Sequence, residues 1–497
     1  METTNTEDAR FMTHFLIPAL LALGLNTLAS LTGWMNPACA AVLAGWAAYS
    51  AWQYRPARRD EYAFCRVLLG AGFAMGLVFV LRLGYLFSWH DLADYSADFS
   101  RYGNRPDGHL GFIAWMVENG RLPLELNPLS EGHSVFYNPP FYHMVQAVFM
   151  KLNLLVLPQS AALENLQIVT FLCAFGTLYT TYQILRELGF SPRAVRTGLW
   201  MMCFQPMLHI LGATLNNDML MVFLAVRCCL FTVRWYRSRS LRDIVRIGVY
   251  LGLGMATKLN CALLIPCIAF VFIYAFFREA PGRRLGYVGP FAAFLAVSVP
   301  EAVAWPVHNL IAFGLPLNYV RLPSEAIKVA DYSLWARFGI PDWFARRGIF
   351  FTGLRKYNHN VWMQTLSTGL FDELTLFEDG TLMWYVCYLL LAAFAGLLVL
   401  GFGAALFKAF SRRDRVEKPV MAFLLSYGVI LLFSYLKFCV DYPYMCTFNF
   451  RYILPILMLC AIGFAHLRER RAGLLAELYA ISFSLLTILI YSQGLRP

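Results

Sequence analysis

Uninterrupted apolar segments recur along the whole chain and decide its fold class. Many of them extend for about 18 residues or more, and a helix of that length crosses a hydrocarbon core of roughly 30 Å. Hydrophobic residues make up 59% of the 497 residues and charged residues only 14%, against about 25% charged residues in a typical soluble protein. The sequence therefore predicts an all-α, polytopic membrane protein, and it argues against a water-soluble enzyme or a disordered chain.

The apolar segments predict about 13 membrane-spanning helices. Their predicted ranges are 11–30, 36–53, 67–89, 163–184, 192–212, 218–236, 242–256, 260–277, 286–305, 382–406, 420–438, 450–465 and 474–492. Two short spans meet at residues 257–259, and interrupted spans of this kind often bracket a site. The apolar segment 141–157 is too short for a span, so we expect an amphipathic helix that lies in the outer interface.

The basic residues lie mainly in short loops between the predicted spans, which explains the net charge of +11 without nucleic acid. The arginine-rich loops contain Arg55, Arg58, Arg59, Arg66, Arg234, Arg237, Arg239, Arg242, Arg412, Arg413, Arg415, Arg468, Arg470 and Arg471. Cytoplasmic loops of membrane proteins are enriched in Lys and Arg, so we place these loops and the N-terminus in the cytoplasm. The long polar connections 90–162 and 306–381 then fall outside. No basic groove with interleaved aromatic residues occurs, so we expect no nucleic-acid partner.

The predicted outer face is rich in ionisable residues, which is unusual for so apolar a chain. The candidate residues on this face are Asp91, Asp107, His109, His143, Asp218, Lys258, His308 and Arg451. Transfer of a sugar from a lipid phosphate needs cations that stabilise the departing phosphate. It also needs a carboxylate that takes the proton of the acceptor hydroxyl or holds a metal ion that does so. Acids and cations on one membrane face therefore favour this type of reaction.

Five short motifs follow one another between about residues 85 and 465. They are His90-Asp91 or Asp107-Gly108-His109; Gly120-Arg121-Leu122-Pro123 with Tyr137-Asn138-Pro139-Pro140-Phe141-Tyr142-His143; Asn216-Asn217-Asp218; Gly254-Met255-Ala256-Thr257-Lys258; and Arg451-Tyr452-Ile453-Leu454-Pro455. In this order they resemble the polytopic glycosyltransferases of the GT-C fold, especially the protein O-mannosyltransferase and aminoarabinose-transferase branch. The chain departs from that family where it lacks an Asp-Glu pair in the first loop, so Asp91 and Asp107 both stay candidates for the base.

The resemblance implies a division of the chain into four parts. An N-terminal extension of two helices would occupy residues 1–62, and a GT-C-like catalytic core would occupy residues 63–310 with the first outer loop at 90–162. A second outer segment would follow at 311–381, and C-terminal membrane helices at 382–497. Interfacial helices are expected in both outer segments.

The resemblance also implies an activity. It indicates a glycosyltransferase that moves a hexosyl or pentosyl group from a polyprenyl phosphate to an acceptor on the extracytoplasmic face, with inversion. The acceptor would be a glycan, a lipid or a protein, and membrane lipids would be further partners. Asp91 or Asp107 would act as the base or as a ligand of a divalent metal ion, and Asp218 would assist. No other cofactor is expected.

The remaining candidate residues would bind the substrates. The residues that would hold the lipid phosphate are Lys258, Arg451, His143 and His308. His109 and Tyr137 would contact the acceptor or the sugar. The family often has Lys or His where this chain has Asn138, and His143 could replace that cation.

Other interpretations of the same residues stay open. Asp218 could simply cap a helix, and the Lys258 side chain could extend to the interface without a ligand. A transporter or flippase for a lipid-linked sugar or an anionic solute is the alternative function, but transporters usually bind near the bilayer midplane and show repeats. A scaffold protein would tolerate substitution of these residues. Compact loops without a sorting signal favour a bacterial inner membrane.

Overall fold

The computed structural model is helical throughout its described part. It describes residues 2–56, 59–84, 108–124, 136–317, 319–320, 322, 325–339, 359–372, 374, 376–377, 380–410, 418–471 and 473–495, without the side chains of residues 2–15, 326, 409 and 410. Within this part, the β structure is limited to an isolated bridge between Lys328 and Tyr444. The predicted all-α fold is confirmed.

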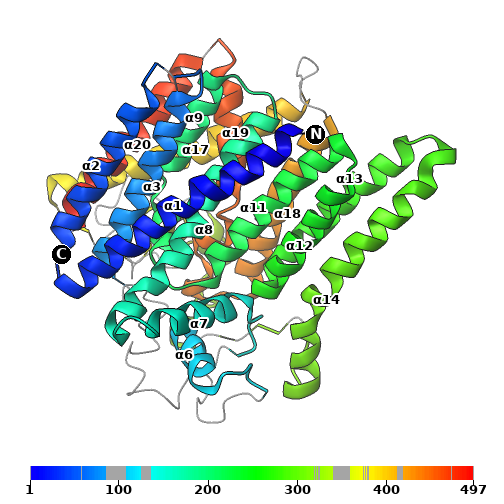
Figure 1. The fold of residues 1–497 in the computed structure, drawn as a ribbon, viewed down its shortest axis with the longest axis horizontal. Helices are drawn as coiled ribbons and strands as arrows, with labels where there is room; N and C mark the ends of the chain where they lie inside the picture. Colours follow the sequence, from blue (N-terminus) through cyan, green and yellow to red (C-terminus); the bar gives the residue numbers. More distant parts are fainter. Residues whose placement is uncertain are drawn as a thin grey trace.

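Helices of very different length follow one another along the chain (Figure 1). They are α1 (Glu2–Thr32), α2 (Met35–Gln53), α3 (Ala63–Leu83), α6 (Gly108–Asn119), α7 (Phe141–Leu154), α8 (Gln159–Glu187), α9 (Pro192–Cys203), α10 (Pro206–Gly212), α11 (Asn217–Ser238), α12 (Leu241–Thr257), η2 (Leu259–Leu264), α13 (Ile265–Arg278), η3 (Pro281–Tyr287), α14 (Val288–Phe313), η4 (Glu325–Ile327), α15 (Leu334–Phe338), α16 (Val361–Phe371), α17 (Leu382–Phe410), α18 (Lys418–Asp441), η5 (Met445–Thr447), η6 (Phe450–Ile453), α19 (Ile456–Arg468) and α20 (Gly473–Gly494).

Eight helical segments of the described chain are long and apolar enough to cross a membrane. A ninth candidate combines Met445–Ile453 with Ile456–Arg468, which are bent by 48° relative to each other. The other predicted spans correspond to shorter or less apolar helices, namely α1, α2, α9, α10 and α12. The prediction of a polytopic membrane protein is therefore confirmed.

One predicted span, 192–212, is interrupted. Helix α9 ends at Cys203 and α10 begins at Pro206, because a proline ring blocks the helical conformation of the residue before it. Gln205 is accordingly extended, with φ −77° and ψ 117°, and its side chain accepts a hydrogen bond from the Leu208 backbone N–H at 3.2 Å. The predicted span 67–89 also ends early within the described residues, at Leu83, where Gly84 takes a positive φ of 63°.

The segment 141–157 forms a helix as predicted, α7. Tyr142, His143, Gln146 and Met150 are buried on one side of it, whereas Val148, Leu152 and other apolar side chains are exposed on the other. A helix with an exposed apolar face at the end of a membrane bundle is typical of an interfacial helix. Its position in the interface stays a prediction.

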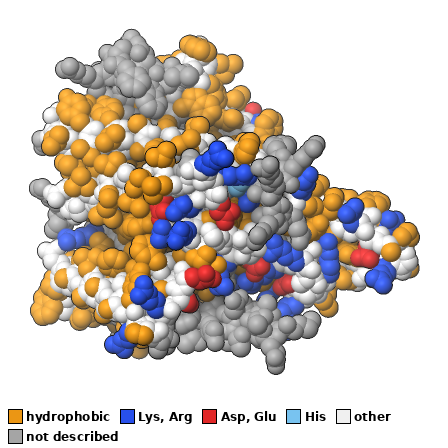
Figure 2. Space-filling view, turned by 90° about the horizontal axis from the view of Figure 1, so that it is seen from above, with side chains coloured by type: hydrophobic (Ala, Val, Ile, Leu, Met, Phe, Trp, Pro, Cys, Tyr) orange, Lys and Arg blue, Asp and Glu red, His pale blue; other side chains and the backbone are white. Residues whose placement is uncertain are grey.

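The two ends of the bundle carry different groups of residues. At one end two of the arginine-rich loops approach the turn at 187–191, since Glu187 pairs with Arg234 at 2.7 Å and the Ser191 backbone N–H donates to Glu469 at 3.0 Å. Figure 2 looks at this end and shows basic side chains gathered with a few acids. Helices α6 and α7 lie at the opposite end (Figure 1). The separation agrees with the predicted placement of arginine-rich loops and the first outer loop on opposite sides.

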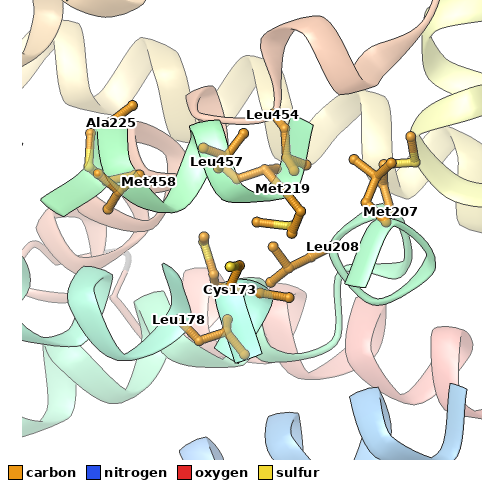
Figure 3. Close-up of a cluster of buried hydrophobic side chains, with 14 of the residues drawn as sticks. Cys173, Leu178, Met207, Leu208, Met219, Ala225, Leu454, Leu457 and Met458 are labelled. Atoms are coloured by element: carbon orange, nitrogen blue, oxygen red, sulfur yellow. The ribbon is translucent and has the colours of Figure 1, made fainter. Parts of the chain in front are cut away.

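An apolar cluster fixes the helices beneath the α6–α7 end (Figure 3). Its labelled members, contributed by α8, α10, α11 and the α19 region, are Cys173, Leu178, Met207, Leu208, Met219, Ala225, Leu454, Leu457 and Met458. Met219 directly follows Asp218, and Leu454 lies three residues after Arg451. Both are almost completely buried, so close packing of their neighbours holds the backbone of both charged residues.

Helices α17 and α19 cross at a glycine contact that offers a stability test. A methyl group on Gly463 would lie 1.8 Å from the Gly401 carbonyl oxygen, a backbone atom that cannot rotate away. We expect Gly463→Ala to lower the free energy of unfolding by about 1–3 kcal/mol. Thermal unfolding in detergent measures this loss. Gly403→Ala is the matched control, because its methyl group would meet nothing within 4 Å. Equal unfolding temperatures for the two variants would contradict the close crossing.

Candidate active site

Asp218 stands at the first turn of α11, at the α6–α7 end of the bundle. Asn216 precedes the helix in an extended conformation, and its side chain accepts a hydrogen bond from the Met219 backbone N–H at 2.8 Å. Asn216 is therefore the cap, and Asp218 is not needed for that role. The Asp218 side chain is only 2% exposed, and the N-terminal end of a helix stabilises a negative charge.

Two cations from other parts of the chain approach this carboxylate. Lys258 Nζ lies 2.5 Å from one Asp218 oxygen, and Arg451 Nε lies 3.8 Å from the other. Lys258 lies between α12 and η2 in an extended conformation, and Arg451 lies in η6. The Asn217 side chain also donates to the Thr257 carbonyl at 3.3 Å, which ties the turn to α11. The structure thus brings together three residues that the sequence analysis placed on one face.

Tyr452 contacts both cations. Its hydroxyl accepts a hydrogen bond from Arg451 Nη2 at 3.1 Å, and its ring centre lies 5.1 Å from Lys258 Nζ. A cation over an aromatic ring is stabilised by the negative face of that ring. The Asp218 carboxylate, the Tyr452 hydroxyl and the Tyr452 ring thus each contact a cation, and these contacts hold Lys258 and Arg451 close to each other.

A second acid, Asp372, lies near Arg451 and was not selected from the sequence. It follows α16 in a left-handed conformation, with φ 50°, and is 8% exposed. Asn449 donates a hydrogen bond to its carboxylate at 3.2 Å. Burial raises the pKa of Asp372, and the nearby Arg451 charge acts in the opposite direction. Asp372 therefore connects the second outer segment to the cations.

His109 and His143 form a pair beside this cluster. His109 Nδ1 lies 2.9 Å from His143 Nε2, and the His143 ring stacks on Phe112 with centroids 4.3 Å apart. Burial lowers the pKa of His109 to about 3, and the charges of Asp218, Lys258 and Arg451 act on it as well. Burial also lowers the pKa of His143, and the neighbouring His109 lowers it further. Both rings are therefore neutral at neutral pH. Of the two, His109 interacts electrostatically with Asp218, Lys258 and Arg451.

His308 and Tyr137 belong to a different junction, where residues 136–137 bind the last turns of α14. The His308 ring stacks on Trp305 with centroids 4.3 Å apart. Trp305 donates to the Phe136 carbonyl at 3.1 Å, and Asn309 donates to the Tyr137 carbonyl at 2.7 Å. These bonds fasten the start of the Asn138-Pro139-Pro140 motif to α14.

The two predicted acids of the first loop, Asp91 and Asp107, lie outside the described residues. Within the residues that are described, no group of three or more His, Cys, Asp or Glu side chains is arranged to hold a metal ion. Asp218 itself is engaged by two cations, which is unfavourable for a metal ligand. The described part of the site therefore fits an anion better than a cation.

The histidine pair leads to a pH prediction. The ordinary histidine pKa is about 6.5. Below that pH both histidines are protonated in the unfolded chain, whereas in the folded chain they stay neutral because burial lowers their pKa. Stability should therefore fall as the pH drops from 7.5 to 5, with each buried histidine costing up to about 1.4 kcal/mol per pH unit. We expect His143→Gln to lose less of its melting temperature over this range than the wild type. Equal losses would mean that His143 is protonated in the folded protein.

The segment that carries Asp218 and Lys258 is similar to a known protein family. Residues 137–305 match the family of dolichyl-phosphate-mannose-protein mannosyltransferases. This segment is about a third of the chain and includes α7 to most of α14. The resemblance that the motifs indicated is confirmed there. No curated protein sequence matches the chain.

Solved structures of membrane enzymes align with most of the chain at low identity. The Archaeoglobus fulgidus oligosaccharyltransferase, solved with Zn and sulfate, has a TM-score of 0.48 and 15% identity, over 86% of this chain and 53% of that one. ArnT from Cupriavidus metallidurans, bound to undecaprenyl phosphate, has a TM-score of 0.34 and 15% identity, over 86% of this chain and 77% of that one. The chain thus spans about half the length of the archaeal enzyme.

Proposed function

We propose that the protein is a membrane glycosyltransferase that moves a sugar from a polyprenyl phosphate to an acceptor on the extracytoplasmic face. The observation that carries the proposal is the pair of ordered cations, Lys258 and Arg451, on one buried carboxylate. They lie at the end of the bundle opposite the arginine-rich loops. The match of residues 137–305 to a mannosyltransferase family supports the same class of reaction.

The cations suit the phosphate of the donor. When the bond between the anomeric carbon and the phosphate oxygen breaks, the electron pair stays on the phosphate, and nearby positive groups stabilise that charge. Asp218 keeps Lys258 and Arg451 in position before the substrate binds. Its negative charge also limits the attraction for the product, so that polyprenyl phosphate can leave.

The acceptor hydroxyl would attack the anomeric carbon from the opposite side, which gives inversion. Its proton would pass to the carboxylate of Asp91 or Asp107. Either carboxylate could instead hold a divalent metal ion, which would polarise the attacking oxygen. His109 would hydrogen bond to the sugar or the acceptor as a neutral ring, because it lies within electrostatic range of Asp218 and Lys258. The acceptor would be a glycan, a lipid or a protein.

The placement in the membrane is part of the proposal. The arginine-rich end would face the cytoplasm, and α7 would lie in the outer interface with its exposed apolar side chains among the lipids. We favour a bacterial inner membrane.

A transfer assay tests the proposal. The purified protein in nanodiscs is offered a panel of polyprenyl-phosphate sugars, and the release of polyprenyl phosphate is followed. We expect release with one donor, and a loss of about 10²–10⁴-fold in Asp91→Ala or Asp107→Ala, whichever removes the base. Tight donor binding without release, unchanged in both variants, would contradict the transferase and favour a transporter.

A further inference from the structure

Arg239 has an unusual backbone at the arginine-rich end of the bundle. It follows α11 as the residue that ends the helix, in the left-handed conformation with φ 53° and ψ 21°. Its backbone N–H donates to the Trp235 carbonyl at 2.8 Å. Glycine is the residue usually found at such a position, because a side chain strains this conformation.

The Arg239 side chain lies on aromatic rings and has a hydrogen-bond donor without an acceptor among the described residues. The guanidinium carbon lies 4.9 Å from the Trp235 ring centre and 4.4 Å from the Tyr236 ring centre. Its Nη1 atom is buried, and no acceptor among the described residues binds it; the buried Trp235 Nε1 is in the same situation. Both atoms can only donate, so each is a donor that lacks an acceptor within the described part of the chain.

Two acids from neighbouring segments, Glu279 and Asp243, have hydrogen-bond partners other than Arg239. Glu279 accepts a hydrogen bond from the Tyr287 hydroxyl at 3.4 Å. Asp243 accepts from Ser238 and Ser240 at 2.7 and 2.8 Å. With Nη1 unbonded among the described residues, the Arg239 guanidinium is available to an external anion.

An arm formed by α13, η3 and α14 borders this position. Tyr287, at the end of η3, lies within electrostatic range of Arg239, and its ring centre is 6.4 Å from that of Trp235. The tip of the arm projects from the bundle in Figure 1 and carries basic side chains in Figure 2. These residues are Arg278, Arg283 and Arg284.

Exposed apolar side chains accompany the arginines at the tip. Phe277 is 64% exposed and Leu285 is 83% exposed. Cationic groups beside exposed apolar ones match the boundary between phosphate headgroups and acyl chains. A free inorganic anion would need only the cations, whereas a lipid uses both kinds of side chain.

We propose that Arg239, stacked on Trp235 and Tyr236 beside the arm formed by α13, η3 and α14, binds the phosphate of an anionic phospholipid in the leaflet on the arginine-rich side. The Arg239 guanidinium donates to the phosphate oxygens, and the arm's exposed apolar side chains contact the acyl chains. This site lies at the opposite end of the bundle from Asp218 and does not depend on the proposed transferase activity.

Lipid binding to the full chain tests this site. Protein in detergent micelles is titrated with dioleoylphosphatidylglycerol, with dioleoylphosphatidylcholine, and with inorganic phosphate as a competitor, and bound lipid is counted by native mass spectrometry. Arg239→Gly is the informative variant, because glycine fits the left-handed conformation and should not lower the melting temperature. Arg193→Gln is the control, since it removes an exposed arginine on α9 at the same end of the bundle.

We expect the wild type to retain one phosphatidylglycerol in preference to phosphatidylcholine. Arg239→Gly should weaken this binding by about tenfold, the effect of losing a charged hydrogen bond, and Arg239→Lys should restore only part of it, because an ammonium group lacks the planar stacking. Arg193→Gln should bind as the wild type does. Unchanged binding in Arg239→Gly would overturn the site, and full displacement by millimolar inorganic phosphate would overturn its assignment to a lipid.

Discussion

We expect Lys258→Met to lower the rate of polyprenyl phosphate release by about 10²–10³-fold, the loss typical when one group that stabilises a developing anion is removed. Methionine has a similar length and leaves the turn between α12 and η2 filled. The loss should appear in the maximal rate, because the charge on the phosphate is greatest when the sugar departs. Initial rates over a range of donor concentrations measure it.

Lys437→Met provides the control for this experiment. Lys437 is 63% exposed and pairs with Asp441 on its own helix, α18, at 2.5 Å. The substitution has the same chemistry but removes an exposed cation, so transfer should continue at the wild-type rate. A Lys258→Met enzyme as fast as this control would exclude Lys258 from phosphate stabilisation and would leave Arg451 as the candidate.

The fold follows from the apolar segments for a simple physical reason. A helix that lies in lipid must satisfy all its backbone hydrogen bonds internally, so a long apolar segment has few alternatives. The interruption at Gln205-Pro206 was missed because Met202, Cys203 and Phe204 continue the apolar pattern on one side and Met207 and Leu208 on the other. Proline in a membrane helix is often tolerated, and the sequence does not reveal whether the helix bends or ends.

Short helices between the predicted spans were harder to predict. Helices α6 and α16 have only 12 and 11 residues, and helices of that length are marginal on their own. Their formation depends on packing against α7, α10 and α17. Such contacts between distant segments are not visible in a single sequence.

The site was predicted in part, and the reason differs between its residues. Asp218, Lys258 and Arg451 could be grouped because each stands at the same end of a predicted span. Asp372 does not stand at the end of a predicted span, and its hydrogen bond with Asn449 depends on the packed structure. Tyr452 stands beside Arg451 in the quoted motif, but its contact with Lys258 joins distant segments. The bond between His109 and His143 likewise joins residues 34 positions apart. The roles proposed for all these residues stay predictions.

The largest stability effect is expected at Asp218. Asp218→Asn keeps the shape of the side chain but removes the charge that pairs with Lys258 and Arg451, so that Lys258 loses its counter-ion and Arg451 keeps only the nearby Asp372 among the described acids. Breaking a buried pair by removing one partner typically costs about 3–5 kcal/mol. We therefore expect a marked fall in the melting temperature in detergent. Asp441→Asn, at an exposed pair, should cost no more than about 1 kcal/mol.

A second substitution separates charge from packing in this result. If the uncompensated cations destabilise Asp218→Asn, then removing one of them in Asp218→Asn/Lys258→Met should recover a large part of the lost melting temperature, although two contacts are now missing. Additive losses would instead mean that the two side chains act independently, since coupling appears only between groups that interact. Such additivity would contradict the ion pair as the element that holds Lys258 in place for the donor phosphate.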